Sequence, residues 1–195
     1  MLKVGITGGI GSGKTTICNF FDVLGLPIFI ADTEAKRIMD SSPIVRSKLI
    51  LSFGEEIYLP NHALDRKKLA KMVFNSPLLL AKINSIVHPE VHKHFQEWCN
   101  RQDSPYIVYE AAILFESGFY QEMDFNILVT APEEERVKRV LLREHTTEND
   151  IKNRIAKQWQ DNEKEELADF IIANNNRELI IPQLIELDKK FRIHE

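Results

Sequence analysis

The chain has 195 residues, of which 44% are hydrophobic and 28% are charged, and its formal net charge is −4 at pH 7. This composition is ordinary for a globular protein, its small negative charge argues against a general nucleic-acid binder, and no apolar run approaches the ~20 residues that span a bilayer. The two cysteines stand far apart in apolar patterns, so we expect reduced thiols and a cytoplasmic location. The N-terminus reads as a strand and not as a basic region followed by an apolar stretch, so we expect no signal peptide.

The first predicted strand leads directly into a phosphate-binding motif. Residues 3–7 predict a buried strand, and residues 8–15 read Gly-Gly-Ile-Gly-Ser-Gly-Lys-Thr, a complete P-loop that a predicted helix follows. Backbone N–H groups of such a loop cradle phosphates, while Lys14 reaches the β- and γ-phosphates and the Thr15 hydroxyl ligates Mg²⁺. The alternative, a glycine-rich turn without a ligand, disagrees with the strand–loop–helix context.

A second strand is predicted at residues 26–30, and it ends next to an acidic residue. Asp32 follows this strand and, in an open α/β sheet, would point into the crevice where ligands bind. In the other interpretation, Asp32 or Thr33 caps a short helix at residues 34–39. The local sequence leaves both interpretations open, and one carboxylate can serve both.

Residues 41–103 predict helices and no strand. Ser42-Pro43 and Ser76-Pro77 mark helix starts, and Asp65 is expected to cap a further helix. His88-Pro89 is expected to interrupt the third helix, because a residue before proline avoids helical geometry. The basic cluster at residues 66–68 fits either an anion partner or a solvated face.

Three further strands are predicted at residues 106–110, 125–129 and 170–173. Glu110 closes the first of them, where it would hold Mg²⁺ through water or simply be a solvated strand end. The helix after Pro132 places Arg136, Arg139 and Arg143 on one face, which suits either a developing phosphoryl charge or an exposed salt-bridged helix. The charged stretch at residues 161–166 is typical of a mobile lid or a solvated helix.

Several motifs, in this order and spacing, resemble the dephospho-coenzyme A kinase family over essentially the whole chain. They are the P-loop from Thr7 to Thr15, Ala31-Asp32, Leu64-Asp65-Arg66, His88-Pro89, Leu114-Phe115-Glu116, Arg139 with Arg143, Arg154-Ile155 with Gln158, and Ala168-Asp169 with Ile172 and Asn174. The resemblance implies transfer of the ATP γ-phosphate to the ribose 3′-hydroxyl of dephospho-CoA, the last step of coenzyme A synthesis. It also implies ATP and Mg²⁺ as cofactors, only small-molecule partners, and a monomer or weak homo-oligomer.

The P-loop chemistry and the resemblance together assign a role to each candidate site residue. The candidate catalytic residues are Asp32, as the base, Lys14 and Arg139. The residues expected to contact ATP are Gly9, Gly11, Ser12, Gly13, Lys14, Thr15, Thr16, Arg143 and Asn174. The residues expected to contact the acceptor are Thr7, Asp32, Arg66, His88, Leu114 and Phe115, and those expected to hold Mg²⁺ are Thr15 and Glu110. Two positions depart from the family: Ile30 replaces the first aspartate of Asp-Ala-Asp, and Ala112 replaces the proline of Pro-Leu-Leu-Phe-Glu.

The expected fold is an α/β P-loop kinase with a five-stranded parallel sheet of order 2-3-1-4-5. We expect a nucleotide-binding core at residues 1–31 and 104–195, with a lid at about 144–166, and a helical acceptor-binding insertion at 32–103. Three alternatives remain: a kinase of another small nucleotide or nucleoside, a GTP-dependent switch, and a nucleotide sensor without turnover. A GTP-dependent switch needs an Asn-Lys-x-Asp motif that binds guanine, and residues 174–176 do not supply it.

Overall fold

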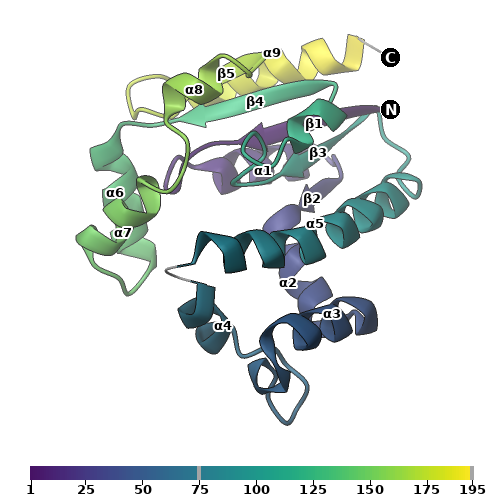
Figure 1. The fold of residues 1–195 in the computed structure, drawn as a ribbon. Coiled ribbons are helices and arrows are strands. Elements are labelled where there is room, and N and C mark those ends of the chain that lie inside the picture. Colours follow the sequence, from purple (N-terminus) through teal and green to yellow (C-terminus); the bar gives the residue numbers. More distant parts are fainter. Residues whose placement is uncertain (74–75, 194–195) are drawn as a thin grey trace. The chain divides into compact units, whose positions relative to one another are not determined.

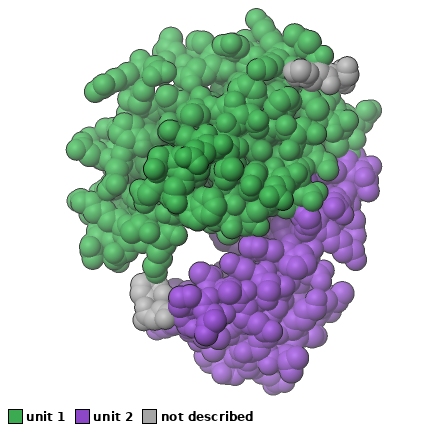
Figure 2. Space-filling view, turned by 45° about the horizontal axis from the view of Figure 1, so that its top comes forward, with its two compact units in different colours: residues 1–30, 102–195 green, residues 31–101 purple. Residues whose placement is uncertain are grey.

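The computed structural model describes residues 1–73 and 76–193. These residues form two compact units, one of residues 1–30 and 102–195 and the other of residues 31–101 (Figure 2). No helix in the described ranges is long and apolar enough to span a membrane.

The first unit contains one sheet of five parallel strands in the part of the chain that the structure describes (Figure 1). Its order is β2-β3-β1-β4-β5, which confirms the predicted fold class. The strands are β1 (Leu2–Thr7), β2 (Ile28–Ile30), β3 (Tyr106–Glu110), β4 (Phe125–Thr130) and β5 (Phe170–Ala173). Glu110 lies opposite both Ile6 and Ile30, so β1, β2 and β3 end together at the carboxyl edge of the sheet.

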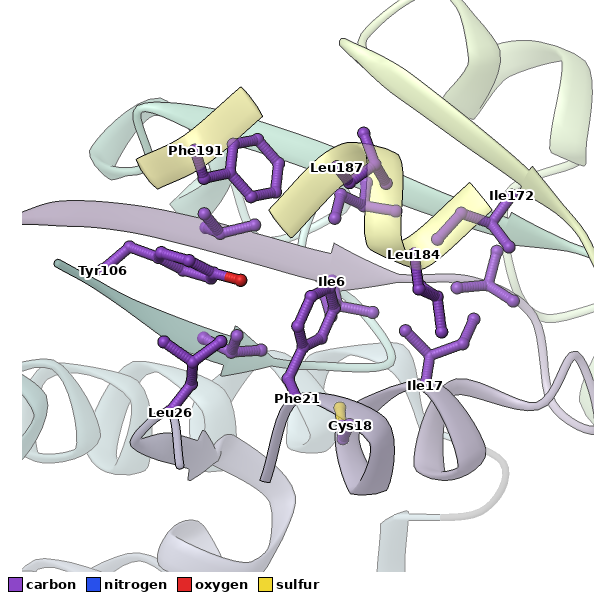
Figure 3. Close-up of a cluster of buried hydrophobic side chains, with 14 residues drawn as sticks. Ile6, Ile17, Cys18, Phe21, Leu26, Tyr106, Ile172, Leu184, Leu187 and Phe191 are labelled. Carbon is purple, nitrogen blue, oxygen red and sulfur yellow. The ribbon is translucent and has the colours of Figure 1, made fainter. Parts of the chain in front are cut away.

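One face of this sheet is covered by helices α1 (Lys14–Val23) and α9 (Ile180–Ile193). Alternate strand residues share a face, so Val4 and Ile6 join side chains of the neighbouring strands in one apolar cluster (Figure 3). In that cluster Phe191 of α9 packs edge-on against Tyr106, with ring centroids 5.3 Å apart. Burial of such side chains stabilises the fold by about 1.5–3 kcal/mol each, which fixes α1 and hence the loop before it.

The opposite face of the sheet is covered in part by residues 111–123. A Cβ at Gly5 would lie 2.7 Å from Leu114 Cδ2 and 2.9 Å from Met123 Cγ, so this segment packs directly on the β1 backbone. The remaining elements of the unit are η2 (Phe119–Glu122), α6 (Glu133–Arg143), α7 (Glu148–Ile155) and α8 (Asp161–Glu165).

The second unit is helical. Its elements are α2 (Ala31–Ser41), α3 (Pro43–Phe53), η1 (Glu55–Ile57), α4 (Arg66–Val73) and α5 (Pro77–Cys99). The predicted helix starts are confirmed, because the side chains of Ser42 and Ser76 accept hydrogen bonds from the N–H groups of Val45 and Leu79. Asp65 likewise caps α4, since its Oδ1 accepts from the Lys68 N–H at 2.9 Å.

Two helix boundaries differ from those expected. The expected break at His88-Pro89 is wrong, because α5 continues through Pro89 from Pro77 to Cys99. A proline inside a helix costs about 3 kcal/mol, but Val87 and Val91 on either side of it are both buried, and their burial offsets that cost. In addition, α2 begins at Ala31, so Asp32 lies within its first turn and is not a residue that precedes the helix.

Candidate active site

The P-loop closes tightly on itself between β1 and α1. Gly9 O accepts the Ser12 N–H at 3.1 Å, and Lys14 Nζ donates to Gly8 O at 2.8 Å. Gly13 is the N-cap of α1 with φ of 102°, a left-handed conformation that other residues rarely adopt. A Cβ at Gly13 would also overlap the Asn174 side chain, so the absence of a side chain gives the loop its shape.

The N-terminus of α1 faces the loop without a side-chain cap. Unpaired N–H groups and the positive end of the helix dipole make such a terminus a site for anions. Thr15 and Thr16, the two residues after Lys14, are both exposed. The loop and the helix therefore offer backbone N–H groups, an ammonium group and hydroxyls within four consecutive positions.

Arg139 and Asn174 hold the P-loop from outside. Asn174 is buried, and its Nδ2 donates to Ser12 O at 2.7 Å. Arg139 Nη1 donates to the same oxygen at 3.2 Å and to Gly11 O at 3.4 Å, while its Nη2 donates to Asn174 O at 3.0 Å. These contacts link α6, the end of β5 and the loop through main-chain carbonyls.

The three arginines of α6 have different surroundings, although their spacing puts them on one face. Arg136 is only 7% exposed, and its Nε donates to Ile10 O at 2.9 Å. Arg143 is exposed and pairs with Glu144 at 2.6 Å, which lowers the pKa of that carboxyl. Arg136, near the start of α6, therefore holds the P-loop through Ile10 O, whereas Arg143, at the end of the helix, forms an exposed ion pair.

Glu110 and Lys14 both lie in the electrostatic surroundings of Cys18 on α1. Burial, and then the negative charge of Glu110, raise the pKa of the Cys18 thiol to about 12, while Lys14 opposes this shift. Glu110 is 9% exposed at the carboxyl edge of the sheet. Carboxylate and hydroxyl oxygens are ligands suited to Mg²⁺, so Glu110 and Thr15 form a chemically suitable pair.

The acceptor residues expected in the first unit are buried. Thr7, Leu114 and Phe115 are each at most 1% exposed. These residues pack inside the unit and expose almost no surface to a ligand.

Two further groups of candidate residues lie within the helical unit. Asp32 is exposed in the first turn of α2, while burial lowers the pKa of the His88 ring on α5 and the charge of Asp32 opposes that shift. The charge of Asp32 therefore acts on the His88 ring in the direction that favours its protonated form. Arg66 Nη2 donates to Lys36 O at 3.0 Å and to Asp40 Oδ2 at 2.5 Å, which fixes the start of α4 against α2.

Sequence reasoning assigned no role to Ile10 and Gln158, although Gln158 is part of a motif. Gln158 Oε1 accepts the Ile10 N–H of the P-loop at 2.9 Å. The Ile10 side chain packs on a cluster of α6 and α7 that contains Val140 and Ile151. Because these partners are more than a hundred residues away in sequence, local patterns give no signal of them.

The P-loop between the first strand and first helix of a parallel 2-3-1-4-5 sheet defines the class of the protein: it is a P-loop kinase. The fold agrees with that of shikimate kinase from Acinetobacter baumannii, at a TM-score of 0.56 and 13% identity, over 100% of this chain and 95% of that one.

The family follows from sequence comparison. A model of the dephospho-CoA kinase family matches residues 2–179. Proteins named dephospho-CoA kinase from Bacteroides fragilis and Porphyromonas gingivalis are 40% and 36% identical, over 95% and 98% of this chain and 91% and 95% of theirs. A crystal structure from Thermus thermophilus has a TM-score of 0.84 at 31% identity, over 97% of this chain and 95% of that one. The chain belongs to the dephospho-CoA kinase family.

Proposed function

We propose that this chain transfers the γ-phosphoryl group of ATP to the ribose 3′-hydroxyl of dephospho-CoA, which gives coenzyme A and ADP. The observation that carries the proposal is the complete P-loop, held in shape by Arg139 and Asn174, in a chain of this family. The oxygen of the 3′-hydroxyl attacks the γ-phosphorus, its proton leaves to a base, and the bond from that phosphorus to the β–γ bridging oxygen breaks.

On the ATP side, the loop amides and Lys14 would bind the phosphates. The Nζ of Lys14 donates to Gly8 O, so its charge is already held within the loop. Thr15 and Glu110 would hold Mg²⁺, Glu110 through water, and the ion supplies charge neutralisation at the transferring phosphoryl group. Thr16 would contact the α-phosphate, one residue further into α1.

On the acceptor side, Asp32 would accept the proton of the 3′-hydroxyl. Asp32 comes two residues after the end of β2, a strand whose carboxyl end lies at the same sheet edge as that of β1. The ring of His88 and the guanidinium of Arg66 would contact the acceptor. With Ile30 in place of the family's first aspartate, Asp32 is the carboxylate available at this strand end.

Arg139 and Arg143 would have different parts in this reaction. The donors of Arg139 already bind carbonyl oxygens of the loop, so it would shape the ATP site and carry positive charge near the phosphates. Arg143 is exposed at the end of α6, where it would contact ATP, and Asn174 would border the adenine.

A coupled assay of ADP release tests this proposal. We expect turnover with dephospho-CoA and none above background with adenosine or common nucleoside monophosphates. Asp32→Asn should lower kcat by at least about 100-fold, since a general base contributes about 10²–10⁴-fold, while ATP affinity and Tm stay unchanged. Asp103→Asn, which changes an exposed carboxylate before β3, is the matched control. A decrease below about fivefold for Asp32→Asn would remove Asp32 as the base.

A further inference from the structure

A completely buried lysine lies in the charged stretch that the sequence suggested was a lid or a solvated helix. Lys164 of α8 is 0% exposed, and its Nζ lies 3.1 Å from Oε1 of Glu116 in the segment after β3. A buried ammonium group is costly unless it is paired, so this ion pair holds α8 firmly to that segment. Removal of one partner would leave the other charge buried alone.

The carboxylate of Glu116 also holds the backbone near the start of α8. Its Oε1 accepts the Trp159 N–H at 3.3 Å. Between these two contacts, Gln160 N–H donates to Glu163 Oε2 at 2.8 Å and closes a capping box. Glu116 therefore fixes residues 159–164 at both ends.

Gln158, the residue before this stretch, connects it to the P-loop. The Gln158 Oε1 accepts the Ile10 N–H at 2.9 Å. In a planar trans peptide the N–H and C=O groups point in opposite directions, so this bond directs the Gly9 carbonyl away from Gln158. Gly9 O accepts the Ser12 N–H at 3.1 Å and lies 3.5 Å from Lys14 Nζ, so Gln158 orients a peptide that holds both the loop and its lysine.

We propose that Lys164 and Glu116 are positioning residues for ATP, which act through Trp159 and Gln158 on the Gly9–Ile10 peptide. The inference rests on the proposed use of the P-loop for ATP. It also limits lid movement to residues before 158, because the stretch from 158 to 164 is fastened to the core of its unit. Dephospho-CoA binding should depend little on this pair.

The test is a double-mutant cycle between Lys164→Met and Gln158→Ala, read by direct ATP binding without acceptor and by both KM values. Each variant should weaken ATP binding by about three- to tenfold, the effect of one ordinary hydrogen bond, with little change in the KM for dephospho-CoA. The double variant should be no weaker than the single ones, because both changes act on one chain of contacts. Additive losses, or equal changes in both KM values, would overturn the proposal.

A second variant separates positioning from general stability. In Lys164→Met with Glu116→Leu, an apolar pair replaces the buried ion pair, so Tm should recover while ATP binding stays weak. Recovery of both together would show that the pair is only structural. Lys152→Met, which breaks an exposed pair with Glu148 on α7, should change neither quantity. If Lys164→Met does not fold, Glu116→Gln and Gln158→Ala complete the cycle.

These measurements also separate this inference from the proposed function. ATP binding is measured without acceptor, so failure of the wild type to phosphorylate dephospho-CoA would reject only the acceptor assignment. Normal ATP binding by the folded Lys164→Met and Gln158→Ala variants would reject only the positioning role.

Discussion

Gly9→Ala should weaken ATP binding by about 10- to 100-fold, although alanine suits the backbone at this position. Gly9 does not have the positive φ of Gly8, Gly11 and Gly13. A Cβ there would instead overlap Nη2 and Cζ of Arg136 and lie 2.9 Å from its Nη1, well inside the about 3.5–4.0 Å of normal non-bonded contact.

The magnitude follows from the contacts that Arg136 would have to release. Its Nε donates to Ile10 O at 2.9 Å, and its Nη1 lies 3.6 Å from Asp161 Oδ2. A hydrogen bond from a charged donor contributes about 1.5–3 kcal/mol, and each 1.4 kcal/mol is a factor of ten in affinity. If Gly9→Ala breaks the hydrogen bond from Arg136 to Ile10 O, the loop conformation that binds ATP loses this energy. The expected decrease in ATP affinity is then about 10- to 100-fold.

The assay is titration calorimetry with ATP, together with Tm, for four proteins: wild type, Gly9→Ala, Arg136→Met and the double variant. The effect of Gly9→Ala should shrink in the Arg136→Met background, where a flexible apolar chain replaces the guanidinium. Gly25→Ala is the control, since its φ of 80° strains the backbone and nothing lies within 4 Å of its Cβ. It should lower Tm but not ATP affinity. An equal effect of Gly9→Ala in both backgrounds would refute the contact with Arg136 as its cause.

Three other predictions concern single side chains. Lys14→Ala should cut turnover by about 100-fold or more, because its charge faces the transferring phosphoryl group; a loss below about threefold in steady-state kinetics would contradict this role. Arg66→Ala should raise the KM for dephospho-CoA more than that for ATP, and equal changes would move Arg66 out of the acceptor site. Because burial raises the pKa of Cys18 to about 12, mass spectrometry should find this thiol unmodified by iodoacetamide at pH 8 in the native protein and alkylated in urea. Alkylation at equal rates in both conditions would show that the thiol is not protected.

Features that depend on neighbouring residues could be predicted from the sequence. The capping of α4 by Asp65 and the helix starts at Ser42 and Ser76 follow from side chains three residues away from their partners. The P-loop is equally local, since its glycines, Lys14 and the following helix form one continuous segment. The strand order depended on resemblance to the family, because hydrophobic patterns do not specify which strands pair.

Features that depend on distant residues required the structure. Pro89 predicts a helix break, yet Val87 and Val91 are buried on both sides of it and keep α5 continuous. The spacing of the α6 arginines places them on one face, but Arg136 and Arg139 contact main-chain carbonyls of distant segments, whereas Arg143 pairs with its neighbour Glu144.

The sequence by itself determined the phosphate-binding loop, the helical insertion and the family to which the chain belongs. Only the tertiary structure decided that Arg136 donates a hydrogen bond to Ile10 O of the P-loop, and that Lys164 is buried against Glu116 and not solvated. The physical reason is that a local motif carries its partners within a few residues. The surroundings of a charged side chain, in contrast, are made by segments that meet only when the sheet has formed.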